Sequence, residues 1–313
     1  MKTILLTGAN GFVGSAIYDA LASSTLYNVI PVVRKGSIID IDGVKFVDDF
    51  DANSDWRGLL EGIDIVIHTA GKAGDGTTGS LESYRAVNTA ATLNLAQQAA
   101  MAGVDRFVFI SSLKVNGETT AMNDPITEHT PAEPVGAYAV SKHEAEIGLN
   151  HIAANSSLDV VTIRPPMVYG QNAKGNFSAL VALIKRRYPL PFGMIHNLRS
   201  FVSIDNLTDF ILTALEHPSA PKGVLFVSDG EDVSTTDLMC RLADAIKSPL
   251  CLFPVPVPVM LLIAAAFGKK NVMRSLTGSF QVDITGTCER LNWKPTISME
   301  KGLAYLASKE LHK

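Results

Sequence analysis

Short apolar runs alternate with longer segments of helical spacing along the first three quarters of the chain. We predict strands at these runs, which cover residues 4–6, 29–33, 46–47, 63–68, 107–110, 160–163 and 224–227. Apolar runs of this length suit strands that are buried on both faces, and strands that alternate with helices favour a parallel sheet. The pattern therefore predicts an α/β fold with a doubly wound parallel sheet.

Pro165 and Pro166 follow the sixth predicted strand and end its hydrogen-bonding ladder. We expect the chain to leave the first domain there, and the sequence beyond residue 229 is mostly helical in pattern. The prediction is a dinucleotide-binding domain over residues 1–165, to which residues 201–228 return, and a smaller, mostly helical substrate lobe over residues 166–200 and 229–313.

Three glycines lie between the first predicted strand and the helical pattern that follows it. Gly8 permits a tight turn, Gly11 lets the backbone approach a phosphate, and Gly14 lets the helix pack on the strand. The spacing predicts a pyrophosphate cradle in a Rossmann fold. A glycine turn that binds nothing is the alternative.

The second predicted strand ends at Arg34 and Lys35, where an NAD-binding fold would place a carboxylate against the ribose hydroxyls. Two cations suit a 2′-phosphate, so we predict NADP, with NAD as the alternative. A solvated basic turn would explain the same residues. Asp48, Asp49 and Phe50 follow the third predicted strand, where adenine would lie. Two adjacent acids in a turn are more often merely solvated, which is the alternative.

Small residues follow the fourth predicted strand. Thr69, Ala70 and Gly71 would let a cofactor lie against the backbone. Asn88 lies among small residues in a predicted helix over residues 81–102, and a buried amide needs hydrogen-bond partners. We expect Asn88 to brace the backbone of the active site.

Tyr138 and Lys142 are four residues apart, on one face of a predicted helix. A neighbouring cation stabilises a phenolate and lowers the pKa of the phenol, so the pair suits proton transfer at a sugar or steroid oxygen. A solvated helix face can carry the same pair. Ser111 ends the fifth predicted strand, where it could donate to a carbonyl oxygen or cap the backbone.

The composition excludes some classes of function. The chain has 313 residues, 47% of them apolar, and a formal net charge of −4, so no broad basic field suggests nucleic acid. Three separated cysteines, Cys240, Cys251 and Cys288, fit neither a metal site nor a disulfide framework. We therefore expect a cytoplasmic protein without a metal.

An apolar stretch over residues 255–267 precedes Gly268, Lys269 and Lys270. It is shorter than the roughly 20 residues that a membrane span needs. We expect a buried helix, and the alternative is a helix at a membrane surface with its lysines at the headgroups.

The motifs together resemble the extended short-chain dehydrogenase/reductases, and more narrowly the NAD-dependent epimerase/dehydratase group of UDP-glucose 4-epimerase relatives. The resemblance rests on the glycine turn, on residues 68–71, 111–112 and 138–142, and on Arg164 with Pro165. It implies that Tyr138 is the acid/base at the sugar 4-oxygen. It also implies that Lys142 binds the nicotinamide ribose and lowers the pKa of Tyr138, and that Ser112 is the catalytic serine.

The resemblance also assigns binding residues and a homodimer. For the cofactor it implies Gly8, Asn10, Gly11, Phe12, Val13, Gly14, Arg34, Asp49, Phe50, Thr69, Ala70, Gly71, Asn88, Ser111, Tyr138, Lys142 and Pro165. For a UDP-linked substrate it implies Ser112, Asn176, Arg199 and Arg274, with Arg199 at the diphosphate.

Two residues depart from the family pattern: Met167 stands where many relatives have Asn, and Arg34 replaces the usual acid. Residues 189–193 and 197–200 are similar to the branch of bacterial O-antigen and polysaccharide pathways. Relatives there reduce UDP-4-keto-6-deoxy-N-acetylhexosamines or epimerise UDP- or lipid-linked N-acetylhexosamines.

Three functions follow from the resemblance. We expect an NADPH-dependent 4-reductase of a UDP-4-keto-6-deoxy-N-acetylhexosamine, which Arg34 and Lys35 favour. The alternative is a UDP-hexose or UDP-N-acetylhexosamine 4-epimerase with retained NAD. A non-catalytic NADP-sensing regulator is a remote alternative, because Ser112, Tyr138 and Lys142 are all present.

Overall fold

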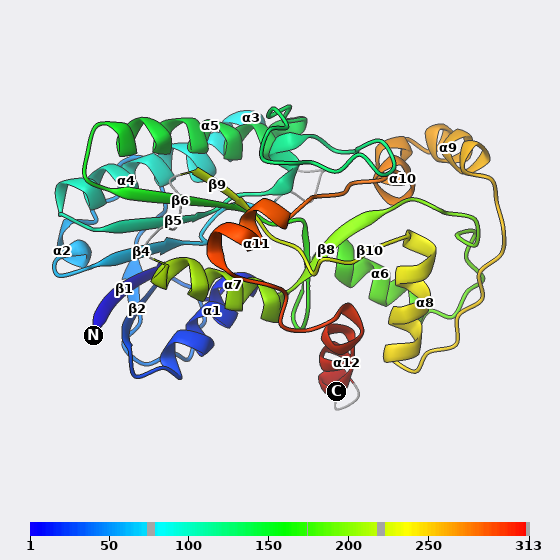
Figure 1. Cartoon of the computed structure of the whole chain (residues 1–313), viewed down its shortest axis with the longest axis horizontal. Coiled ribbons are helices and arrows are strands. Elements are labelled where there is room, and N and C mark those ends of the chain that lie inside the picture. Colours follow the sequence, from blue (N-terminus) through cyan, green and yellow to red (C-terminus); the bar gives the residue numbers. More distant parts are fainter. Residues whose placement is uncertain (74–78, 174, 218–222, 311–313) are drawn as a thin grey trace.

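A seven-stranded parallel sheet forms the centre of the larger part of the molecule (Figure 1). The computed structural model describes residues 1–73, 79–173, 175–217 and 223–310. The strand order is β3-β2-β1-β4-β5-β6-β9. The strands are β1 (Lys2–Thr7), β2 (Tyr27–Arg34), β3 (Lys45–Val47), β4 (Ile65–His68), β5 (Arg106–Ile110), β6 (Asp159–Arg164) and β9 (Gly223–Phe226). The predicted α/β class and doubly wound sheet are confirmed.

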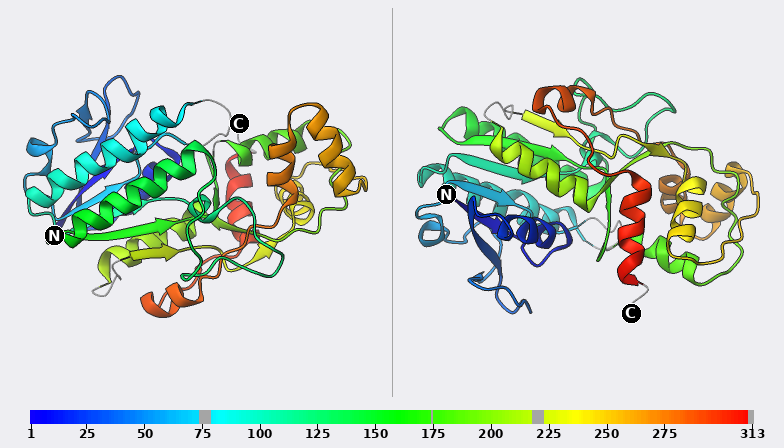
Figure 2. Two further views of the ribbon diagram at one scale, coloured as in Figure 1. Left: turned by 90° about the horizontal axis from the view of Figure 1, so that it is seen from above. Right: turned by 60° about the horizontal axis from the view of Figure 1, so that its bottom comes forward.

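Helices cover both faces of this sheet, as Figure 1 and Figure 2 show. On one face lie α1 (Phe12–Ala22) and α7 (Ile204–Glu216), and on the other α2 (Arg57–Leu60), α4 (Ala91–Met101) and α5 (Gly136–Ala154). The sheet residues are apolar on both sides because each side packs against helices. The chain builds the sheet outward from β1 in one direction through β2 and β3, and in the other through β4, β5 and β6. Folds of this kind bind ligands at the carboxyl ends of the strands where the direction reverses.

The helix predicted over residues 81–102 is interrupted by one wide turn. It consists of α3 (Leu81–Tyr84), a π-helical segment (Arg85–Ala90) and α4. Asn88 lies in the π-helical segment and is fully buried. Such single-turn insertions often occur at functional sites.

A three-stranded sheet of order β10-β8-β7 forms a second layer, with β7 (Met167–Tyr169), β8 (Arg199–Ser203) and β10 (Asp232–Val233). Around it lie α6 (Asn176–Lys185), α8 (Thr235–Ala245), α9 (Val257–Ala266), α10 (Lys270–Thr277) and α12 (Met299–Glu310). The helical character of the C-terminal part is as predicted.

Residues 201–203 and the segment of α11 (Thr285–Leu291) contact a different part of the molecule from the one to which the predicted boundaries assign them. Residues 201–203 belong to β8 and so to the smaller sheet, whereas α7 and β9 lie on the main sheet. Near α11, the Trp293 indole packs on Phe210 of α7 with ring centres 4.9 Å apart. The division into two lobes stays a prediction.

The apolar helix α9 is not the buried helix that we expected. Only Met260 and Ala264 of α9 are buried, and Leu262 is 74% exposed. Periodicity could not reveal this, because α9 is apolar on every side and burial depends on what packs against it. In the described ranges, no helix has both the length and the apolar character that a membrane crossing requires.

Candidate active site

The glycine turn after β1 lets a ligand approach the protein backbone closely. Gly8 has φ +72°, and its carbonyl accepts from the Gly11 N–H at 2.8 Å. A Cβ at Gly14 would lie 2.1 Å from the Gly8 carbonyl oxygen, so α1 can approach β1 only because residue 14 is glycine. Gly11 is the N-cap residue that precedes α1, and no side chain caps the first turn of the helix. An uncapped helix N-terminus beside such a turn fits a dinucleotide pyrophosphate.

The two cations after β2 each face a carboxylate. Arg34 Nη1 lies 3.9 Å from Asp49 Oδ1, and both side chains are 65% exposed. Lys35 pairs with Asp48. A 2′-phosphate here would meet two carboxylates as well as two cations, which weakens the argument for NADP. Asp49 also accepts from the Phe50 N–H at 2.9 Å, and the Phe50 ring lies 5.5 Å from Trp56.

A buried polar chain supports the end of β4. His68 Nδ1 lies 2.8 Å from Thr7 Oγ1, and His68 Nε2 lies 3.0 Å from Thr92 Oγ1. Burial, helped by the Lys142 charge, lowers the pKa of His68 to about 3. His68 is therefore neutral and structural. Thr69 donates to the Thr7 carbonyl at 2.7 Å, which fixes the backbone beside the glycine turn.

Asn88 braces the next segment of backbone, as expected. Its Oδ1 accepts from the Lys72 N–H at 2.7 Å. Its Nδ2 donates to the Lys72 carbonyl at 3.1 Å and to Ser141 Oγ at 3.0 Å. A Cβ at Gly71 would lie 3.0 Å from Asn88 Oδ1 and 3.4 Å from Lys142 Nζ, so Gly71 brings this backbone close to Lys142.

Tyr138, Lys142 and Ser112 meet at the carboxyl end of β5. The Lys142 ammonium donates to the Ile110 carbonyl at 2.9 Å and lies 4.5 Å above the Phe109 ring. Burial lowers the pKa of Lys142 to about 8, and the Glu146 charge offsets part of this effect. Lys142 therefore remains cationic near neutral pH.

The pKa of Tyr138 is raised, whereas the resemblance implied that Lys142 lowers it. Burial raises the pKa of the phenol, and a hydrogen bond with the Ser112 hydroxyl offsets only part of the effect. The Lys142 ammonium donates to the Ile110 carbonyl, and its charge is not among the causes that shift the pKa of Tyr138. The Tyr138 ring also packs edge-on against Tyr84, with centres 6.2 Å apart.

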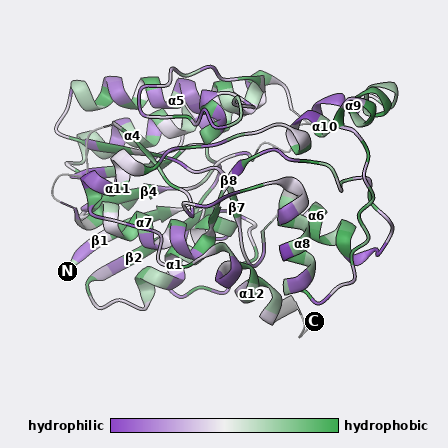
Figure 3. Cartoon of the chain, turned by 45° about the vertical axis from the view of Figure 1, so that its right-hand side comes forward, coloured by the Kyte–Doolittle hydropathy of each residue, from purple (hydrophilic) through white to green (hydrophobic). Residues whose placement is uncertain are grey.

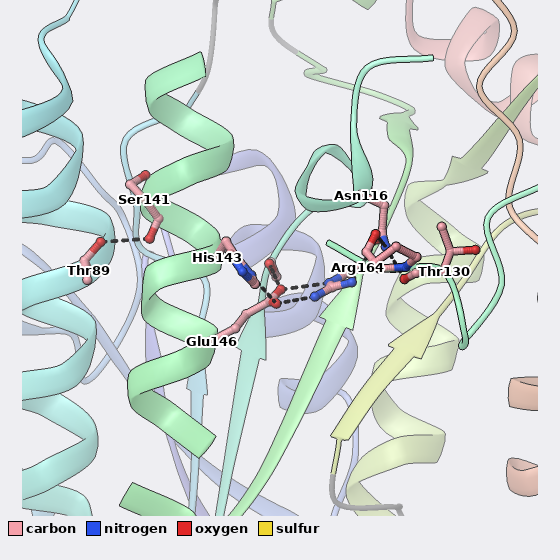
Figure 4. Close-up of polar contacts among 9 residues, drawn as sticks. Thr89, Asn116, Thr130, Ser141, His143, Glu146 and Arg164 are labelled. Carbon is pink, nitrogen blue, oxygen red and sulfur yellow. Dashed lines mark hydrogen bonds and ion pairs between the residues drawn. The ribbon is translucent and has the colours of Figure 1, made fainter. Parts of the chain in front are cut away.

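A buried ionic network lies behind these residues and was missed by the sequence analysis (Figure 4). Glu146 accepts from the Ser111 hydroxyl and is paired with Arg164, whose Nε donates to Glu146 Oε1 at 3.0 Å. Arg164 Nη1 donates to Asn116 Oδ1 at 2.8 Å. Ser111 therefore neither caps the backbone nor points to a substrate oxygen. The available signal was the spacing, since Glu146 lies one turn beyond Lys142.

The predicted substrate residues differ in their exposure to solvent. Arg199 is buried, and its Nη1 donates to the Ser275 carbonyl at 2.5 Å and to the Gly278 carbonyl at 3.2 Å. Burial lowers the pKa of Arg199 to about 10, which leaves it cationic. Arg274 is exposed on α10. Asn176 begins α6, and its side chain lies outside the described part of the chain.

The remaining residues predicted to bind the cofactor lie beside the carboxyl ends of the central strands or at the start of α1. Ala70 follows β4, Asn10 is exposed in the glycine turn, Phe12 and Val13 begin α1, and the Pro165 carbonyl accepts from the Leu113 N–H at 2.9 Å. A pocket of about 680 Å³ lies between α1, α7 and α12, and of the predicted site residues only Phe12 lines it. That pocket is therefore not the predicted site.

Comparison with known proteins identifies the family. The model of the NAD dependent epimerase/dehydratase family matches residues 4–227. The chain is 44% identical over 311 residues to a Vibrio cholerae protein described as UDP-glucose 4-epimerase. The matched region covers 98% of this chain and 94% of that protein. The chain is also 25% identical to an Escherichia coli O157:H7 protein described as N-acetyl-alpha-D-glucosaminyl-diphospho-ditrans,octacis-undecaprenol 4-epimerase, covering 88% of this chain and 81% of that protein.

Solved structures show the same fold. UDP-glucuronic acid 4-epimerase from Bacillus cereus in complex with NAD superimposes with a TM-score of 0.79 at 23% identity, covering 99% of this chain and 100% of that chain. UDP-N-acetylglucosamine 4-epimerase from Methanobrevibacter ruminantium superimposes with a TM-score of 0.81 at 20% identity, covering 99% and 98%. From the family match and the Vibrio relative together, the chain belongs to the NAD-dependent epimerase/dehydratase family.

Proposed function

We propose that this enzyme is a UDP-sugar 4-epimerase that retains NAD. The observation that carries the proposal is the 44% identity to the Vibrio cholerae protein described as UDP-glucose 4-epimerase, along 98% of this chain. Support comes from the meeting of Tyr138, Lys142 and Ser112 at the carboxyl edge of the sheet, close to a glycine turn that fits a dinucleotide. The catalytic and binding roles of the individual residues are part of the proposal.

In the proposed reaction, Tyr138 as phenolate takes the proton of the sugar 4-hydroxyl and later returns it to the 4-oxygen. The Ser112 hydroxyl donates a hydrogen bond to the same oxygen, and the Lys142 ammonium stabilises the phenolate. NAD, when bound, would supply the acceptor and donor of hydride for C4 of the sugar. Asn88 and Gly71 hold the backbone that would face the cofactor.

The epimerase is better supported than the 4-reductase that we expected from the sequence. The expectation of NADPH rested on Arg34 and Lys35, and each of these cations faces a carboxylate. The reductase stays the second candidate, because Arg34 still stands where a ribose-binding acid is usual. Arg199 is proposed to meet the substrate diphosphate, and Asn176 and Arg274 are further candidates for the UDP site.

Product analysis by NMR separates the candidates. The purified protein is incubated with UDP-glucose, UDP-N-acetylglucosamine and a UDP-4-keto-6-deoxy sugar, each with and without NADPH. We expect C4 epimers of the first two without added reductant, and loss of this turnover in Tyr138→Phe. Turnover of the keto sugar alone, and only with NADPH, would instead establish the reductase. No turnover of any sugar by a folded protein that binds NADP would revive the regulator.

We further propose a homodimer in the cytoplasm, following the resemblance. Sedimentation velocity tests the assembly, and a single species of one chain's mass would contradict it.

A further inference from the structure

The helices α9 and α10 carry an apolar surface that the proposed function does not use. Val259, Leu262, Ile263 and Ala266 are exposed and spaced by three and four residues, so they share one face of α9. The opposite face holds Met260 and Ala264, which are buried. A surface helix normally has polar residues on its outer face, so this face is suited to contact an apolar partner.

The apolar face continues past the end of the helix. Phe267 is 76% exposed, and Val272 on α10 is also exposed. Figure 3 shows α9 as a hydrophobic helix beside the more polar α10 at one end of the molecule, and Figure 1 shows that this end lies away from the main sheet. We call the exposed side chains of Val259, Leu262, Ile263, Ala266, Phe267 and Val272 the α9 patch.

Two exposed lysines directly follow Phe267 of the α9 patch, and no acid lies in this stretch of sequence. Residues 245–282 contain Lys247, Lys269, Lys270 and Arg274 but no Asp or Glu, in a chain of net charge −4. Lys269, Lys270 and Arg274 are exposed, and in the described ranges no carboxylate forms an ion pair with them. An apolar face edged by unpaired lysines matches an anionic surface with an apolar interior.

We propose that the α9 patch docks the enzyme on an anionic phospholipid membrane surface, with Leu262 and Phe267 entering the acyl boundary and Lys269 and Lys270 at the headgroups. A second copy of the chain is a poorer occupant, because a symmetric contact would bring these lysines against their own copies. The docking does not depend on the proposed function. The helices α9 and α10 that carry the patch contact the predicted substrate lobe, because Arg199 Nη1 donates to the Ser275 carbonyl of α10 at 2.5 Å.

Vesicle co-sedimentation tests the proposal with the full chain. We expect the protein to sediment with vesicles of phosphatidylcholine and phosphatidylglycerol, and to remain in solution with phosphatidylcholine alone. Binding weakens as salt is raised, since exposed charges are screened. Lys270→Gln lowers the affinity about fivefold, the amount expected for one lysine near an anionic surface.

Negative charge placed on the α9 patch should weaken the binding to anionic vesicles. The double variant Leu262→Glu with Phe267→Glu is expected to bind at least about tenfold more weakly than the wild type. Met101→Glu is the matched control, because Met101 is 76% exposed like Phe267 but lies at the end of α4. It should sediment like the wild type. All variants should keep the wild-type turnover of UDP-sugar in the absence of vesicles.

Three outcomes overturn the proposal. The wild type stays in solution with anionic vesicles at low salt, or the double variant sediments as well as the wild type. Alternatively, the wild type self-associates without lipid and the double variant does not, which assigns the patch to a second copy. Vesicle binding without turnover of any UDP-sugar would overturn the proposed function and leave the docking surface standing.

Discussion

Lys142 and Tyr138 are one helical turn apart, and burial moves their pKa values away from each other. Withdrawal from water lowers the pKa of the Lys142 ammonium to about 8 and raises that of the Tyr138 phenol. Both effects favour the neutral form of the group concerned. The Glu146 carboxylate opposes the effect on Lys142 and so helps to keep it cationic.

The depressed pKa of Lys142 predicts a rise of stability with pH. The folded protein releases this proton near pH 8, whereas the unfolded chain holds it to about pH 10.5, so the unfolded state binds more protons between these values. The free energy of unfolding of the wild type, relative to Lys142→Met, should rise by about 2 kcal/mol from about pH 7.5 to about pH 9.5. Urea unfolding of both proteins at the two pH values measures it. An unchanged difference would show that Lys142 is not desolvated.

The pair formed by Glu146 and Arg164 should be costly to break from one side. Both side chains are nearly fully buried, so Glu146→Gln leaves the guanidinium without a counter-charge. We expect a loss of about 3 kcal/mol in the free energy of unfolding. The double variant Glu146→Gln with Arg164→Met should lose less than the sum of the two single losses. Additive losses in urea unfolding would contradict the coupling.

At the scale of elements, the approach of α1 to β1 depends on a residue without a side chain. Gly14 faces the Gly8 carbonyl, and a methyl group there would overlap backbone atoms that cannot rotate away. The same approach holds the first turn of α1 beside the end of β4, where Thr69 donates to the Thr7 carbonyl. A shift of α1 would therefore open the turn that we propose for the pyrophosphate.

Gly14→Ala should lower stability by about 1–3 kcal/mol and weaken NAD binding, because the overlap forces α1 away from β1. Gly58→Ala is the matched control. Gly58 lies in α2, and a Cβ there has no atom within 4 Å. Thermal unfolding and NAD titration by calorimetry compare the two. Equal behaviour of both variants would contradict the close packing at residue 14.

At the scale of the whole molecule, a buried polar group joins the smaller sheet to α7, which packs on the main sheet. The Tyr169 hydroxyl of β7 donates to Asp229 Oδ2 at 2.8 Å. Asp229 Oδ1 accepts from the Ser203 N–H at 2.9 Å and from Asn206 Nδ2 of α7 at 2.7 Å. The Asn206 amide oxygen in turn accepts from the Thr296 N–H at 2.9 Å, ahead of α12. One carboxylate thus connects β7, β8, α7 and the C-terminal segment.

Tyr169→Phe removes the hydroxyl from this group and leaves Asp229 Oδ2 buried with one donor fewer. We expect a loss of about 1–3 kcal/mol in the free energy of unfolding. Tyr305→Phe serves as the control, since Tyr305 lies exposed on α12. Hydrogen exchange should speed up in β7 and β8 of the first variant only. Unchanged protection there would show that Asp229 does not hold the smaller sheet against α7.

Periodicity and glycine spacing determined the class of the fold, the order of its central strands along the chain and the helix that carries Tyr138 and Lys142. These features follow from the chain's local chemistry: apolar runs form buried strands, and a turn that approaches a helix needs glycine. The family could also be recognised from the sequence alone, because its motifs are short and contiguous.

Tertiary structure decided what each side chain faces. The carboxylates opposite Arg34 and Lys35 follow the neighbouring strand, whereas the Glu146 network behind Ser111 and the carbonyls that hold Arg199 come from more distant parts of the chain. The raised pKa of Tyr138 and the exposure of α9 have the same origin. Burial and pairing are properties of the assembled neighbours, and spacing within a single segment, such as that of Lys142 and Glu146, does not identify the partner from another element.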